Sequence, residues 1–191
     1  HDFLISNAEM ERDLLSDEDF ASRITSLEKL ERLELRGLDF SSKSFDILGK
    51  VPQLSSLKLD SCKLTDDNLG CLGKNIREIT IEGLEEASFT PLFQAMRALH
   101  TNGIPLQKFE LFGSDVTPTI LSLAQFMLEN FASLRALLIS DFIIEKTPAV
   151  FKPLKQVLAV NIEELDLTGI SWSSESNCQQ FFETLLAQPL P

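Results

Sequence analysis

Nucleophilic catalysis is the first chemistry to look for in this chain, because it needs a Ser or Cys within reach of a His. The residues of these types that stand out in the 191-residue sequence are His1, His100, Cys62, Cys71 and Cys178. His1 is the first residue, and His100 stands near the end of an expected helix, where a lone His is an ordinary residue. No pair of nucleophile and base is indicated, so we expect no catalytic residues.

Metal and phosphate sites are not indicated either. Asp66 and Asp67 adjoin an expected helix start, where carboxylates suit the helix dipole, and metal sites need grouped ligands. Residues 70–74, Gly-Cys-Leu-Gly-Lys, lack the Gly-x-x-x-x-Gly-Lys-Ser/Thr spacing of a phosphate loop. We therefore expect no metal, no cofactor and no enzymatic activity.

Composition narrows the class of partner and the compartment. The net charge is -12, which disfavours nucleic acid and anionic membranes as partners, because both need clustered Lys and Arg. No apolar run of about 18 residues is present, so no transmembrane helix is expected. The Cys residues are scattered and no Asn-x-Ser/Thr site occurs, which favours a reducing, cytoplasmic location.

One apolar pattern recurs along the chain, and it must build the scaffold for any functional surface. Its clearest copy has apolar residues at relative positions 1, 4, 6, 9 and 11: Leu54, Leu57, Leu59, Cys62 and Leu64. Further copies start at Leu30, Ile76, Leu106, Leu134 and Ile162, and a truncated copy starts at Phe3. From Leu30 on, successive starts differ by 24, 22, 30, 28 and 28 residues. Such a period predicts stacked repeats that share one core.

Each copy predicts a short strand followed by a helical segment. Around positions 4 and 6 apolar and polar residues alternate, as in a strand with one buried side. Three later segments begin with Thr-Pro, at Thr90, Thr117 and Thr147, where Thr suits the N-cap and Pro the first helical position. Asn102-Gly103 predicts a helix stop. Between residues 120 and 131 the apolar residues form one helical stripe from which Phe126 is excluded.

This pattern resembles the leucine-rich-repeat family, in the long-repeat subclass typified by ribonuclease inhibitor. The resemblance implies an α/β fold: a right-handed solenoid of about seven repeats, with a parallel sheet on the concave face and helices on the convex face. Residues 1–191 would form a single domain, excerpted from a longer protein. The family usually has Asn or Cys at position 9, but here only Cys62 conforms among Ala8, Leu38, Leu84, Ser114, Phe142 and Ile170. Such divergence is more usual in irregular intracellular members of the family.

The concave side of the sheet is the expected binding surface. Mixed charges predominate there, with an acidic bias that grows toward the last repeat. Phe112 and Leu138 stand where charge is expected, and neighbouring exposed apolar residues mark interfaces. We predict that these two residues anchor a partner and that Lys108, Glu110 and Arg135 form the rim. The further candidate partner-binding residues on this side are Glu34, Arg36 and Lys58.

Both ends of the repeat array carry apolar residues that need covering. Phe3 and Ile5 stand at the start, and Phe181, Phe182, Leu185 and Leu186 at the finish. A missing repeat, a cap or a second chain would cover them, so contact through uncapped ends of the solenoid is a further expectation.

The residues and the resemblance together favour a non-catalytic module that binds a protein or peptide through the concave sheet. Its context would be a larger protein, such as a ubiquitin-ligase substrate receptor, an innate sensor or a bacterial effector. Two alternatives stay open: a leucine-rich-repeat protein that activates a GTPase, and a structural arm that sets spacing within a multidomain protein.

Overall fold

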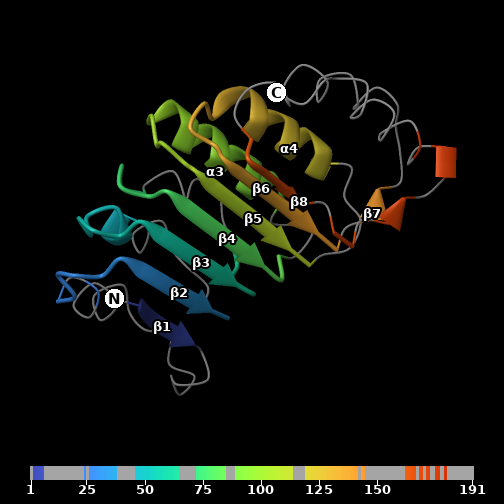
Figure 1. Cartoon of the computed structure of the whole chain (residues 1–191). Coiled ribbons are helices and arrows are strands. Elements are labelled where there is room, and N and C mark those ends of the chain that lie inside the picture. Colours follow the sequence, from blue (N-terminus) through green and yellow to red (C-terminus); the bar gives the residue numbers. More distant parts are fainter. Residues whose placement is uncertain are drawn as a thin grey trace.

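The structure is a computed structural model of an α/β protein with one large parallel sheet (Figure 1). It describes residues 2–6, 24, 26–37, 46–64, 72–84, 89–113, 119–141, 143–144, 162–166, 168–169, 171–172, 175–176 and 179. The Thr117 and Thr147 caps, position 9 of all copies except Cys62 and Leu84, and the apolar residues at 181–186 lie outside these residues. So do His1, Asp66, Asp67, Cys71 and Cys178, and for Phe3 and Ile5 only the backbone is described.

In the described residues, the sheet contains seven strands that pair in the order in which they follow along the chain. They are β1 (Asp2–Ser6), β2 (Arg32–Arg36), β3 (Ser56–Asp60), β4 (Glu78–Glu82), β5 (Lys108–Phe112), β6 (Ala136–Ser140) and β8 (Glu164–Asp166). Every pairing is parallel. A separate parallel pair joins β7 (Ile143–Ile144) to β9 (Ser171–Trp172). Each of the seven sheet strands falls on a copy of the sequence pattern, so the predicted strands are confirmed.

One side of the sheet is the core side, as the alternating pattern predicts. Positions 4 and 6 of the copies lie in register across the strands, so Leu33, Leu57 and Ile79 form one buried row. From Leu33 to Ile139 these positions are at most 2% exposed. Each such side chain fully buried contributes on the order of 1.5–3 kcal/mol of hydrophobic free energy. Because the alternation has period 2, positions 3, 5 and 7 must point to the opposite side.

The same backbone turn follows β2, β3, β4, β5, β6 and β8, at position 8 of the pattern. The residues there have φ between 53° and 70°, and they are Gly37, Ser61, Gly83, Gly113, Asp141 and Gly169. Glycine suits this conformation because it has no Cβ. In five of these residues the N–H donates to the carbonyl of position 7 in the next copy, at N···O distances of 2.8–3.2 Å. This contact fastens neighbouring turns together at the end of the sheet.

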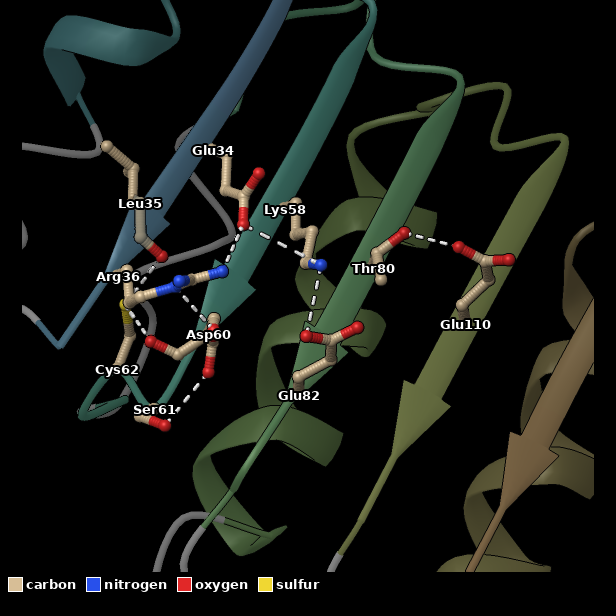
Figure 2. Close-up of polar contacts among 10 residues, drawn as sticks. All are labelled: Glu34, Leu35, Arg36, Lys58, Asp60, Ser61, Cys62, Thr80, Glu82 and Glu110. Carbon is tan, nitrogen blue, oxygen red and sulfur yellow. Dashed lines mark hydrogen bonds and ion pairs between the residues drawn. The ribbon is translucent and has the colours of Figure 1, made fainter. Parts of the chain in front are cut away.

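Cys62, which follows one of these turns, is buried at position 9. Its thiol donates to the carbonyl of Leu35 on the neighbouring copy, with an S···O distance of 3.2 Å (Figure 2). The inward position predicted for Cys62 is therefore confirmed. At Leu84, the other described position 9, an apolar side chain is buried instead.

Two long helices, α3 (Phe89–Thr101) and α4 (Thr119–Asn130), lie side by side against one face of the sheet (Figure 1). The predicted start of α3 is two residues late, because Pro91 lies inside the first turn rather than at its first residue. Proline is tolerated there since the first N–H groups of a helix have no partner within it. The predicted stop is confirmed: Gly103 has φ 68°, and the N–H groups of Gly103 and Ile104 donate to His100 and Leu99.

An aromatic cluster joins the two helices. Phe126 lies edge-on to Phe93 and to Phe131, with ring centroids 5.4 Å and 6.3 Å apart. The Arg97 guanidinium lies 4.6 Å from the centre of the Phe93 ring. Phe126 is only partly buried, in line with its place outside the predicted core-facing stripe, and its ring packs against Phe93 of α3 as well as against the edge of the core.

Among the residues that the structure describes, no helix is both long enough and apolar enough to span a membrane.

Candidate protein-binding face

The side of the sheet opposite the core is the candidate binding surface, and we call it the open face. It carries positions 3, 5 and 7 of each copy, arranged in three rows across the strands. From β2 to β8 the rows are Arg32, Ser56, Glu78, Lys108, Ala136 and Glu164; then Glu34, Lys58, Thr80, Glu110, Leu138 and Asp166; then Arg36, Asp60, Glu82, Phe112 and Ser140. Neighbouring strands lie about 4.8 Å apart, so side chains that are neighbours in a row can contact each other directly.

A network of ion pairs crosses β2, β3 and β4 on this face (Figure 2). The Arg36 guanidinium is 2.7 Å from an Asp60 carboxylate oxygen and 3.0 Å from one of Glu34. The Lys58 amine lies 3.6 Å from Glu34 and 3.0 Å from Glu82. Each of the two cations therefore joins carboxylates from different strands, and the network spans three strands.

The protonation of Lys58 reflects this position. Burial lowers its pKa, but the hydrogen bond and charge of Glu82, with the charges of Glu34 and Asp60, raise it more, so the pKa lies above its ordinary value. Lys58 is therefore held in its charged form. Isolated surface ion pairs contribute little to stability, and a network that several strands share is the exception.

A second polar group lies on β4 and β5 around Glu110. The Thr80 hydroxyl donates to one carboxylate oxygen of Glu110 at 2.6 Å, and the Lys108 amine lies 2.9 Å from the other. The hydrogen bond to Glu110 raises the pKa of Lys108, burial opposes it, and the charges of Glu110, Glu164 and Glu78 add to the rise. Both oxygens of Glu110 are therefore occupied from within the sheet.

The predicted apolar pair, Phe112 and Leu138, differs in exposure from the prediction. Phe112 is partly exposed, but Leu138 is 9% exposed and is not the open anchor that the sequence predicts. Leu138 lies in register between Glu110 and Asp166, whose side chains stand on either side of it. Phe112 is in register with Ser140, so the two apolar residues are diagonal neighbours on the same side of the sheet.

The eight predicted binding residues fall into two groups. Glu34, Arg36 and Lys58 are together in the network at β2 and β3. The other five lie at β5 and β6, namely Lys108, Glu110, Phe112, Leu138 and the exposed residue Arg135 that precedes β6. The Arg135 guanidinium is 3.6 Å from a carboxylate oxygen of Glu163 in the next copy. The ion-pair partner of Arg135 is therefore not one of the other predicted rim residues, Lys108 and Glu110.

Three residues that the site prediction omits contact these groups. The Glu82 carboxylate forms an ion pair with the Lys58 amine on one side, and Glu82 is in register with Phe112 on the other. Thr80 binds Glu110 across the strands, and Asp60 binds Arg36. Their positions in the repeat carry the signal, because Thr80 has the same position as Lys58 and Glu110, and Glu82 the same as Phe112.

The charge of the open face changes along the sheet. On β2 and β3 three cationic side chains stand against two acidic ones, and the cations are Arg32, Arg36 and Lys58. From β4 to β8 one cation, Lys108, stands against five acids, namely Glu78, Glu82, Glu110, Glu164 and Asp166. Within the described strands the acidic excess lies on β4 and β8, which carry two acids each and no cation, and it does not rise steadily along the sheet.

His100, the described residue singled out for possible catalysis besides Cys62, is not on this face. His100 lies at the end of α3, on the helix side of the sheet, with its ring edge-on to Phe126 and Phe131. The described part of the chain contains no group of three or more His, Cys, Asp or Glu that is arranged to hold a metal ion. The described positions of the open face carry charged, polar and apolar side chains.

A scan against models of protein families finds no match to this chain, and a search of curated proteins finds none either.

Proposed function

We propose that the chain is a non-catalytic recognition module that binds a protein or peptide through the open face. One observation carries the proposal: Phe112 is a large, partly exposed apolar side chain that the core does not use, in a row of the open face whose other described members are polar. Interfaces typically combine such an aromatic anchor with a polar rim. The open face offers both on a surface that several strands share.

The proposal includes the architecture behind this surface. It is a right-handed leucine-rich-repeat solenoid of about seven repeats, with the open face as its concave side, forming one domain of a longer cytoplasmic protein. The order of the strands along the chain and the recurring turn at position 8 support stacked repeats. The apolar ends of such an array would be covered by further repeats or by a partner. A recognition arm of a ubiquitin-ligase receptor, an innate sensor or a bacterial effector fits this arrangement.

Selection from an unbiased random-peptide library tests the proposal. Peptides are selected on the wild-type chain, and their affinities are then measured for Phe112→Asp and for Gln94→Asp. Gln94 is exposed on α3, on the helix side, so this control introduces the same charge away from the open face. Circular dichroism checks that both variants fold.

We expect Phe112→Asp to lower the affinity of the selected peptides about tenfold or more, because the substitution places a charge where an apolar anchor packs. Gln94→Asp should leave their affinities unchanged. If the selected peptides bind Phe112→Asp as tightly as the wild type, or lose affinity only for Gln94→Asp, the open face is not the binding surface.

A further inference from the structure

The open side of β6 is an uncharged band within a charged surface. Its three residues, Ala136, Leu138 and Ser140, are 8–9% exposed. Phe112 on β5 continues the band, because it stands in register with Ser140 and is itself partly exposed. No other strand of the described sheet from β2 to β8 lacks charge at all of its described open-face positions.

Carboxylates border this band on both sides. On one side Glu82 is in register with Phe112, and Glu110 with Leu138. On the other side Glu164 is in register with Ala136, and Asp166 with Leu138. An uncharged strip on β5 and β6, with acidic residues along both borders, is therefore built from four neighbouring strands, β4, β5, β6 and β8.

The cations near the band are already engaged. Lys108, the one cation at the open-face positions of β4 to β8, is bound to Glu110. Arg135 lies beside Glu163. In contrast, the side chains of Glu78 and Glu164 make no hydrogen bond or ion pair of their own with the residues that the structure describes, although their charges act on Lys108. Glu78 and Glu164 are thus the described acidic side chains of this region without a cationic partner, whereas Glu82, Glu110 and Asp166 are engaged by Lys58, Lys108 and Thr168.

We infer that, if the open face binds a protein segment as proposed above, that segment carries an apolar side chain flanked on both sides by Lys or Arg. The apolar side chain contacts Phe112, at the edge of the uncharged band. The basic side chains reach Glu164, which borders the band beside Ala136, and Glu78, which lies beyond Lys108 in the same row. An acidic segment meets the same carboxylates and is repelled, because Lys108 is already neutralised.

The test uses three fluorescein-labelled synthetic peptides of equal length. The first has a central Trp between two pairs of Lys, the second has Glu in place of each Lys, and the third keeps Lys but has Ser in place of Trp. Dissociation constants are measured by fluorescence anisotropy for the wild-type chain at low and moderate salt. The first peptide should bind about tenfold tighter than either of the others, and added salt should weaken it.

A matched pair of variants locates the contact. Glu78→Lys with Glu164→Lys reverses the charges of these two carboxylates, whereas Glu28→Lys with Asp46→Lys makes the same change of net charge at two exposed positions off the strands. The first double variant should bind the Lys–Trp–Lys peptide about tenfold more weakly than the wild type, and the second less than twofold more weakly. Equal losses for the two pairs, or binding of the Glu peptide as tight as that of the Lys peptide, would overturn the inference.

The library selection separates this inference from the proposed function. If the selected peptides bind Phe112→Asp more weakly but are acidic or uncharged, the inference of a basic partner is wrong and the proposed binding face is retained. If the selected peptides bind Phe112→Asp as tightly as the wild type, both the inference and the proposed binding face are wrong. Selected peptides that depend on Phe112 and carry Lys or Arg around an apolar residue support both.

Discussion

The turn after each strand allows a sharp test of the packing at the end of the sheet. Gly83 and Gly113 occupy the same position in neighbouring copies, and both have φ 61°. A Cβ added at Gly113 meets no atom within 4 Å, whereas a Cβ added at Gly83 lies 2.8 Å from the Ser61 hydroxyl oxygen. The two substitutions to Ala therefore share a backbone cost and differ in one steric contact.

The magnitudes follow from these two terms. Placing a residue with a Cβ in the left-handed region destabilises the folded state by about 1–2 kcal/mol. Replacing glycine also restricts the unfolded chain, which stabilises the protein by about 0.4–1 kcal/mol. Gly113→Ala should then lower the free energy of unfolding by about 1 kcal/mol. For Gly83→Ala, the Ser61 hydroxyl must rotate away and lose its 2.9 Å hydrogen bond to Asp60. That loss adds about 0.5–1.5 kcal/mol, for a total near 2 kcal/mol.

Urea unfolding followed by far-UV circular dichroism measures both values, with Ser61→Ala as the third variant. In the Ser61→Ala background the nearest atoms to the new Cβ at position 83 are backbone atoms at 3.5 Å, an ordinary contact distance. Gly83→Ala should therefore cost no more than Gly113→Ala in that background. Equal costs of the two substitutions in the wild-type chain, or no relief from Ser61→Ala, would refute this reasoning.

Three further predictions concern the core and the open face. Phe109→Ala removes a fully buried ring and should lower the free energy of unfolding by about 3–5 kcal/mol in the same urea experiment. Thr80→Val keeps the side-chain shape but removes the donor to Glu110, and should cost about 1 kcal/mol, whereas an unchanged urea midpoint would show that this bond contributes nothing. The folded-state pKa of Lys58 is raised, so its contribution to stability is present below about pH 10 and is lost as pH rises through the folded pKa. Glu82→Gln should make the fall of the urea midpoint above about pH 10 shallower, and a fall as steep as in the wild type would contradict the assignment of Glu82 as the main partner.

The strands could be predicted from the sequence because their signal is local. Leu57 and Leu59 alternate with polar residues within one short segment, and this alternation alone determines which side is buried. The stop of α3 at Gly103 is also local, because it depends on a backbone conformation that glycine adopts readily. The turn at position 8 is predictable on the same ground, because four of its six described residues are glycine.

The exposure of Leu138 depends on residues far away in the sequence, and for that reason it escaped prediction. Glu110 and Asp166 stand beside Leu138 in the sheet, and each is 28 positions away along the chain. The choice of ion-pair partners has the same origin. Charge alone puts Lys58 near several acids, and only the register and the side-chain conformations pair it with Glu82 and Glu34.

The most direct measurement of where this protein binds is NMR mapping of backbone amides during titration with a peptide selected from the random library. We expect the largest chemical-shift changes in β4, β5 and β6, centred on Phe112, with little change in α3 and α4. Changes confined to the two helices, with Phe112 and its neighbours unaffected, would contradict the assignment of the open face as the binding surface.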